Sequence, residues 1–262
     1  MNAQQHKSPH LQPLPISKNQ MERGVETIEW TPESLKQVSA ALEDSSPDAI
    51  LRWGFEHFAP SIVMATGFGP EGIVLMHLIS QIRPETIVFY LDTDLLFSQT
   101  YELRDELVRR LGIRLERVHS GISLPEQAFR HGDTLWANDP DTCCHIRKVI
   151  PQRQFLANYS AWITGIRRDQ TAFRANTALV EWDYANKMVK LNPLAGWTSD
   201  HVWAHIHENN LPYNELHDYG YPSIGCWTCT KAVAPGADPR SGRWSGDIKT
   251  ECGIHLPSIK KQ

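Results

Sequence analysis

The chain has 262 residues, of which 41% are hydrophobic, so it is long enough to bury the core of one large domain. Its formal net charge of −4 argues against a generally basic nucleic-acid-binding protein. No apolar run approaches the roughly 20 residues that a membrane helix needs. We therefore expect a globular protein with no nucleic-acid partner and no membrane association.

Residues 1–25 are polar and contain several prolines, and we expect this segment to be disordered. Residues 26–240 are predicted to form a single α/β domain, and residues 241–262 a C-terminal tail. No apolar stretch of the signal-peptide type precedes the domain, so we expect a cytoplasmic protein whose thiols stay reduced.

Strands and helices are predicted to alternate from residue 61 onward. Short apolar, β-branched runs predict strands at 61–66, 86–91, 113–118 and 161–164, whereas helical spacing of apolar residues predicts helices from Pro70, over 95–111 and over 146–156. Several of these strands are apolar on both faces. The pattern therefore predicts a parallel sheet flanked by helices.

Ligands bind such sheets at the carboxyl ends of the strands, so segments 66–71, 92–94 and 165–168 should face one crevice. The turn after the first strand offers backbone N–H groups and a helix N-terminus to an anion; it consists of Thr66, Gly67, Phe68 and Gly69. An ordinary strand-to-helix connection is the alternative for this turn.

Four arginines could bind phosphate or sulfate through two nitrogens at once: Arg167, Arg168, Arg240 and Arg243. The first two follow the predicted strand 161–164, where a pair of surface charges is the alternative. The last two belong to a loop that contains glycine and proline.

Five cysteines divide into a set of four and one that stands apart. Cys143 and Cys144 are adjacent, Cys226 and Cys229 form a C-x-x-C motif, and Cys252 lies near the C-terminus. Soft thiolate ligands favour zinc or an iron–sulfur cluster. Vicinal cysteines can aim both sulfurs inward only if one of them adopts a turn or helix-start conformation. Disulfides and buried structural thiols are the alternatives, and the cytoplasmic expectation favours a metal.

A predicted helix that begins after Thr198 or Ser199 carries His201, His205 and His207. The first two have the i, i+4 spacing of a metal-binding pair. No third ligand accompanies them, so we expect ordinary surface histidines.

Several motifs together resemble the assimilatory sulfonucleotide reductases, the adenylyl-sulfate and phosphoadenylyl-sulfate reductases. These motifs are Cys143-Cys144 followed by Lys148, the segment 212–230 that ends in the C-x-x-C motif, Gly242-Arg243-Trp244, and Glu-Cys-Gly-Ile-His-Leu at 251–256. The resemblance runs from about residue 61 to 256. It implies an adenine-nucleotide α-hydrolase-like fold of the PP-loop type and one 4Fe-4S cluster per chain on the four paired cysteines. Thioredoxin or glutaredoxin would be the reductant.

In that family a cysteine thiolate attacks the sulfur of a sulfonucleotide, and the resemblance assigns this role to Cys252. An S-sulfocysteine would form, AMP would leave, and the reductant would release sulfite. The resemblance assigns substrate binding to the turn 66–69, Lys148 and the four arginines. His255, three residues after Cys252, could orient the thiolate or contact the sulfonucleotide, and an ordinary tail histidine is the alternative. Family members with a cluster mostly use adenylyl sulfate (APS), which we expect here, with 3′-phosphoadenylyl sulfate (PAPS) as the alternative. We also expect a homo-oligomer.

Two residues depart from the family pattern. Phe68 stands where the usual Ser-x-Ser-Gly turn has its second serine, and Asp94 replaces the glycine of the usual Asp-Thr-Gly. The carboxylate of Asp94 either points away from the substrate or alters nucleotide preference.

Two other functions compete with the reductase. An ATP-pyrophosphatase-type enzyme needs a fuller Ser-Gly-Gly-x-Asp-Ser turn, which segment 67–72 lacks. A non-catalytic metal-cluster protein would have no use for the tail cysteine in its Gly-Ile-His setting.

Overall fold

The computed structural model describes residues 29–244 and 253–255. Contacts group the chain into two units, Met1–Trp30 and Thr31–Gln262, and the second unit contains the helices and strands. The segment 1–25, Cys252 and the other tail residues beyond 244, except 253–255, lie outside the described residues. No helix of the described part has the length and apolar character to cross a membrane.

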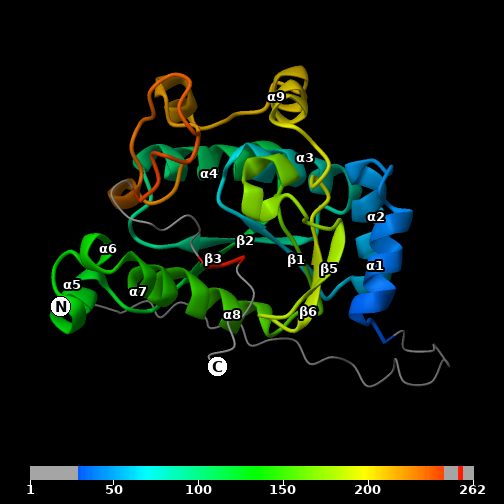
Figure 1. Cartoon of the computed structure of the whole chain (residues 1–262), viewed down its shortest axis with the longest axis horizontal. Helices are drawn as coiled ribbons and strands as arrows, with labels where there is room; N and C mark the ends of the chain where they lie inside the picture. Colours follow the sequence, from blue (N-terminus) through cyan, green and yellow to red (C-terminus); the bar gives the residue numbers. More distant parts are fainter. Residues whose placement is uncertain (1–28, 245–252, 256–262) are drawn as a thin grey trace, which may run out of the picture. The chain divides into compact units, whose positions relative to one another are not determined.

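A six-stranded sheet forms the centre of this unit, in the order β3-β2-β1-β4-β6-β5 (Figure 1). Its strands are β1 (Ile62–Thr66), β2 (Ile87–Asp92), β3 (Arg114–His119), β4 (Ala161–Ile163), β5 (Val180–Asp183) and β6 (Met188–Leu191). The pairs from β3 to β6 are parallel, which confirms the predicted class. Only β5 is antiparallel, with Val180 opposite Leu191. The hairpin of β5 and β6 was absent from the sequence prediction.

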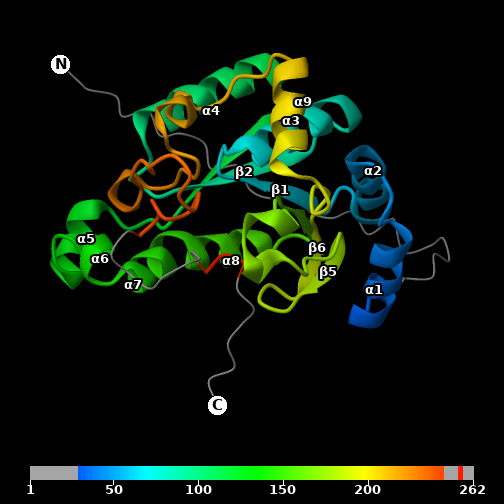
Figure 2. The same ribbon diagram turned by 45° about the horizontal axis from the view of Figure 1, so that its top comes forward.

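Helices cover both faces of the sheet (Figures 1 and 2). On one face, α2 (Pro47–Phe58) and α3 (Pro70–Ile82) contact β1. On the other, α8 (Ile150–Leu156) contacts β3, and its Leu156 packs in a core cluster with Trp162 and Phe89. The sheet is therefore buried on both sides, as its apolar strands predicted.

The remaining helices connect the strands or lie at the ends of the sheet. They are α1 (Pro32–Ala41), α4 (Ser98–Leu111), α5 (Leu124–His131), α6 (Leu135–Asn138), α7 (Pro140–Cys144) and α9 (Ser199–Glu208). A π-helical turn, η2 (His145–Val149), joins α7 to α8, and short 3₁₀ turns occur at η3 (Arg168–Gln170), η4 (Ala172–Arg174), η5 (Glu215–Tyr219) and η6 (Trp227–Cys229).

Local signals set several helix boundaries. The Thr198 hydroxyl accepts a hydrogen bond from His201 N at 3.3 Å and caps α9, and Gly112 ends α4 with a left-handed φ of 62°. One helix boundary differs from the prediction because of contacts with a distant segment. The helix predicted from Leu95 begins at Ser98, because Leu95 O accepts a hydrogen bond from Trp227 N at 2.8 Å and Leu96 pairs with Cys226.

Candidate active site

The four paired cysteines line one pocket. Cys143 and Cys144 end α7 and are both buried, so the helical conformation turns both vicinal sulfurs into the same pocket, as their spacing required. Cys226 is buried at the start of η6, and Cys229 is half-buried at its end. Sulfurs that are 82 or more residues apart in the sequence therefore converge in the folded chain.

Backbone pairing holds the C-x-x-C motif against the loop that follows β2. Besides the Leu95 contact, the N–H of Trp244 donates to Cys229 O at 3.0 Å, and Thr230 pairs with Arg243. The loop after β2 also contributes Thr93, whose Oγ1 lies 3.2 Å from Cys226 Sγ. The pocket is thus assembled from three segments of the chain.

Two cations belong to the same pocket, Arg147 and Lys148. The Arg147 side chain is only 1% exposed. Burial raises the pKa of Cys226, but the charge of Lys148 and the hydrogen bond with Thr93 outweigh it and leave that pKa below its ordinary value. In contrast, burial and the neighbouring thiols raise the pKa of Cys143 to about 12. The two thiols therefore differ in how readily they ionise.

The donor set suits an iron–sulfur cluster. Neither a carboxylate nor an imidazole lines the pocket beside the four thiols. Within residues 29–244 and 253–255, no group of three or more His, Cys, Asp or Glu side chains is arranged to hold a single metal ion.

The turn after β1 is tightly constrained. Phe68 N donates to Thr66 Oγ1 at 3.0 Å, and Phe68 has a positive φ of 58°. Its ring is buried and lies 5.2 Å from the ring of Tyr90, measured between centroids. Gly69 is the N-cap of α3 and makes no side-chain hydrogen bond, so no N-cap side chain competes with an anion for the first N–H groups of the helix. Packing of the Phe68 ring explains why an apolar residue can replace the family's serine.

Arg167 lies near this turn but is engaged by carboxylates. Its Nε donates to Glu71 Oε1 at 2.9 Å, and its Nη1 donates to Asp169 Oδ1 at 2.5 Å. Gln170 Nε2 also donates to Glu71 Oε1, at 3.0 Å. Arg167 therefore joins the segment after β4 to the first turn of α3.

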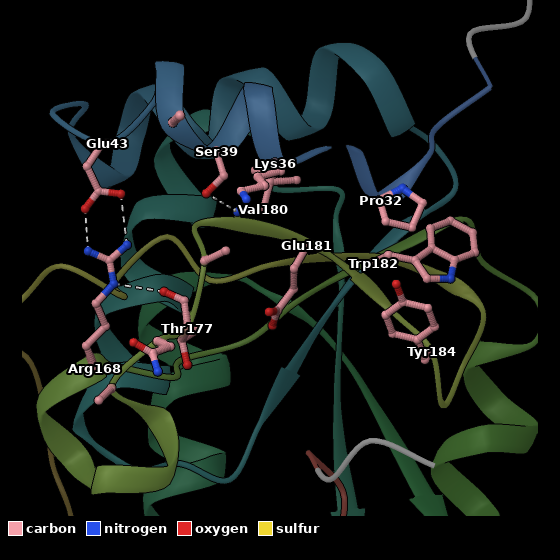
Figure 3. A pocket seen from close by; sticks show the side chains of 14 residues that line it. Pro32, Lys36, Ser39, Glu43, Arg168, Thr177, Val180, Glu181, Trp182 and Tyr184 are labelled. Carbon is pink, nitrogen blue, oxygen red and sulfur yellow. Dashed lines mark hydrogen bonds and ion pairs between the residues drawn. The ribbon is translucent and has the colours of Figure 1, made fainter. Parts of the chain in front are cut away.

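Arg168 points elsewhere. It lines a separate cavity of about 570 Å³ beside α1 and β5, where its guanidinium forms an ion pair with Glu43 and donates to Thr177 O at 2.8 Å (Figure 3). The expectation that Arg167 and Arg168 face one crevice is wrong for Arg168, because Glu43 draws its side chain away.

The loop after η6 brings Arg240 and Arg243 toward the indole ring of Trp244, with guanidinium-to-centroid distances of 5.9 and 4.6 Å. Arg243 also donates to Ser223 Oγ at 3.3 Å, and its charge acts on Cys226. Arg243 therefore acts electrostatically on the cysteine pocket, and its predicted contact with phosphate or sulfate stays a prediction.

The described part of the tail contacts η2 and β4. Gly253 approaches Val149, and the ring of His255 stacks on Trp162 with centroids 5.6 Å apart and an angle of 11°. Burial and the charges of Lys190, Arg174 and Arg240 hold the pKa of His255 well below its usual range. His255 thus lies among cations, a setting that favours an anionic ligand. Cys252, next to Gly253, lies outside the described residues.

The histidines of α9 are not all surface residues. His201 and His207 are exposed, but His205 is half-buried, with its Nε2 3.0 Å from His77 Nδ1 on α3. The surface prediction was wrong for His205, because α9 packs against α3.

Arg147 and Thr93 line the cysteine pocket but were not among the predicted site residues. Both stood next to residues that had been singled out: Thr93 precedes Asp94, and Arg147 precedes Lys148. Their adjacency was the available signal, but only the folded chain shows that both turn toward the thiols.

The family model of the phosphoadenosine phosphosulfate reductase domain matches residues 61–232. The chain belongs to the phosphoadenosine phosphosulfate reductase family. A member of this family from Salinibacter ruber, named adenosine 5′-phosphosulfate reductase, is 50% identical over 228 residues, which are 86% of this chain and 90% of that protein. A protein of the same name from Shouchella clausii is 46% identical over 224 residues, which are 85% and 93% of the two chains.

Solved structures agree with the family. The phosphoadenylyl-sulfate (PAPS) reductase of Candida auris, in a phosphate complex, superposes with a TM-score of 0.70 at 34% identity, over 78% of this chain and 99% of that one. An FMN adenylyltransferase of Candida glabrata reaches a TM-score of 0.52 at 18% identity, over 76% and 65% of the two chains, and shows a similarity of fold alone. The reductase resemblance and the PP-loop-like fold predicted from sequence are thereby confirmed.

Proposed function

We propose that this protein reduces adenylyl sulfate to sulfite and AMP in sulfate assimilation, with thioredoxin or glutaredoxin as the reductant. The convergence of Cys143, Cys144, Cys226 and Cys229 in one pocket carries the proposal. The names of relatives at 46–50% identity, which align along most of both chains, support adenylyl sulfate over PAPS. The enzyme is proposed to work in the cytoplasm as a homo-oligomer.

The four cysteines would hold one 4Fe-4S cluster per chain. Bound there, the cluster would supply a compact centre of charge beside the substrate and cross-link three segments of the chain. The chain contributes Lys148 and Arg147 to balance the negative charge of the thiolates, and Thr93 donates toward Cys226.

In the first step, the Cys252 thiolate would attack the sulfur of the sulfuryl group. A bond forms between the two sulfurs while the bond from sulfur to the bridging phosphate oxygen breaks, and the electron pair leaves with AMP. A dithiol of the reductant would then supply two electrons: one thiolate attacks Cys252 Sγ and expels sulfite, and the second thiol resolves the mixed disulfide. The dithiol becomes a disulfide, and Cys252 returns as a thiol.

The other groups would bind and orient the nucleotide. The N-terminus of α3 and the backbone of Thr66, Gly67, Phe68 and Gly69 are proposed to hold a phosphate. Lys148, Arg240, Arg243 and His255 are proposed to stabilise the charge of the sulfuryl group and leaving phosphate. Arg167 would order the turn through Glu71. The Glu43 ion pair of Arg168 favours a structural role for that residue.

Substrate choice is tested by kcat/KM for the two nucleotides with thioredoxin in excess. A higher value for adenylyl sulfate supports the proposal, and a higher value for PAPS replaces the proposed substrate by its 3′-phosphorylated form.

The cluster is tested by metal analysis of anaerobically purified protein. We expect about four iron per chain and loss of iron in Cys226→Ser. Stoichiometric zinc without iron would contradict the cluster.

The nucleophile is tested by intact-mass spectrometry after incubation with adenylyl sulfate and before addition of reductant. The wild type should gain one SO₃ group. Cys252→Ser should keep its iron and bind nucleotide but gain none. An adduct that persists in Cys252→Ser would assign the attack to another residue.

A further inference from the structure

Asp94, the residue that departs from the family's Asp-Thr-Gly, has an unusual backbone conformation. Its φ is 57°, in the left-handed region that glycine adopts without strain, and its N–H donates to Asp92 Oδ1 at 2.9 Å. Asp is among the few non-glycine residues that tolerate this region. The turn alone would be equally well formed by glycine, so the retained side chain calls for a second explanation.

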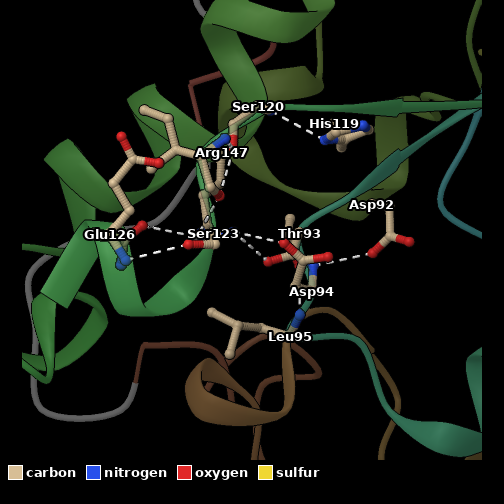
Figure 4. Close-up of polar contacts among 12 residues, drawn as sticks. Asp92, Thr93, Asp94, Leu95, His119, Ser120, Ser123, Glu126 and Arg147 are labelled. Carbon is tan, nitrogen blue, oxygen red and sulfur yellow. Dashed lines mark hydrogen bonds and ion pairs between the residues drawn. The ribbon is translucent and has the colours of Figure 1, made fainter.

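The carboxylate of Asp94 bridges two arginines from different elements. Arg147 Nη1 on η2 donates to Oδ2 at 3.1 Å (Figure 4). Arg117 Nη2 on β3 donates to Oδ1 at 3.0 Å. Arg147 has three further partners, and all are neutral: Gln127 Oε1, Thr93 O and Ile122 O. Among the hydrogen bonds of the described residues, Asp94 is the one carboxylate that Arg147 contacts.

Arg147 connects this carboxylate to the cysteine pocket. The same Nη1 that reaches Asp94 also donates to Thr93 O at 2.9 Å, and Thr93 Oγ1 lies 3.2 Å from Cys226 Sγ. Arg147 itself lines the pocket with the cysteines. A buried guanidinium that loses its charged partner is strongly disfavoured, so neutralising Asp94 should displace Arg147 and disturb Thr93.

We propose that Asp94 is a positioning residue of the four-cysteine site: its carboxylate fixes Arg147, which in turn holds Thr93 beside Cys226. This role rests on the proposed function for the identity of the bound cluster, whereas the contacts of Asp94, Arg147 and Thr93 are those of the folded chain. The carboxylate of Asp94 faces Arg147 and Arg117.

The test compares Asp94→Asn and Asp94→Gly with the wild type. Asn keeps the tolerance for positive φ and removes the charge, whereas Gly relieves the turn and removes the whole side chain. Iron release to a chelator, measured anaerobically, should be about tenfold faster or more in both variants, as loss of a charged hydrogen bond predicts. The visible circular dichroism of the cluster should change in the same way in both.

Asp105→Asn is the matched control, because Asp105 forms an arginine pair with Arg104 at 2.8 Å on the exposed side of α4. It should release iron at the wild-type rate. The inference is overturned if Asp94→Gly behaves as the wild type, or if iron release in both variants follows only their loss of thermal stability with an unchanged cluster spectrum.

Failure of the proposed function gives a different result. If the wild type binds no iron, the cluster proposal fails, and alkylation of the Cys226 thiol, located by peptide mass mapping, then decides the inference. We expect faster alkylation in Asp94→Asn because Thr93 no longer holds the sulfur, and equal rates would overturn it.

Discussion

Gly165 lies two residues after the end of β4, where the chain passes the first turn of α3 at close range. A Cβ atom at this position would lie 2.8 Å from Glu71 Cβ, and 3.5 Å from Glu71 C and Gly72 N. The φ of Gly165 is not in the left-handed region, so the cost of alanine is steric. Gly165→Ala therefore tests how tightly α3 is seated against the end of the sheet.

The magnitude follows from these distances. Non-bonded carbons are optimally about 3.5–4.0 Å apart, so Glu71 must retreat by roughly 0.7 Å or more. Retreat is restricted because α3 is itself tightly packed: a Cβ on Gly72 would lie 2.6 Å from Thr66 Oγ1. Overpacking of this kind costs about 1–3 kcal/mol, which lowers the melting temperature by about 2–12 °C for a domain of this size.

Urea unfolding of Gly165→Ala and wild type at equal iron content measures the change, as a lower midpoint with an unchanged m-value. Gly196→Ala is the matched control, because a Cβ there has no neighbour within 4 Å and its φ is not positive. It should change the free energy of unfolding by less than about 1 kcal/mol, in the stabilising direction. Equal midpoints for the two alanine variants would refute the close-packing argument.

Three further predictions concern side chains. Burial raises the pKa of Asp92, but hydrogen bonds from Tyr101 and Arg117 outweigh it and lower that pKa. The contribution of Asp92 to stability is therefore present above about pH 4 and is lost as the pH falls through the pKa of the folded state. Asp92→Asn should lower the free energy of unfolding by about 1–3 kcal/mol at pH 7 and reduce its dependence on pH in the acid range. Burial lowers the pKa of His205, so the unfolded state binds the proton at a higher pH than the folded state does, and the free energy of unfolding should fall as the pH drops below about 6.5. His205→Gln should weaken this pH dependence, measured by denaturant titrations between pH 7 and 5. Ser46 Oγ accepts a hydrogen bond from Ala49 N at 3.3 Å and caps α2. Ser46→Ala should lower the free energy of unfolding by about 1 kcal/mol in the same assay. An unchanged free energy would show that water replaces the cap.

The parallel core of the sheet could be predicted from the sequence because its signals are local. The apolar, β-branched runs at 61–66 and 86–91 form the largely buried strands β1 and β2. Gly112 ends its helix because glycine adopts the left-handed conformation without strain. The β5–β6 hairpin was missed. Its strands have only four residues each, and β6 is fully buried while β5 is partly covered, so neither shows a clear alternation.

The sequence by itself determined the set of four paired thiols, because cysteine spacing and the surrounding motifs are properties of the chain. Which charges meet was decided only by the tertiary structure. Asp94 reaches Arg147 across 53 residues, Arg167 reaches Glu71 across 96, and Arg168 is drawn to Glu43 across 125. An arginine at the end of a strand can pair with any carboxylate within its reach, and local sequence carries no information about which carboxylate the fold brings there. The side chains of the adjacent Arg167 and Arg168 therefore point in different directions in the folded protein. Arg167 contacts the first turn of α3, and Arg168 lines the cavity beside α1.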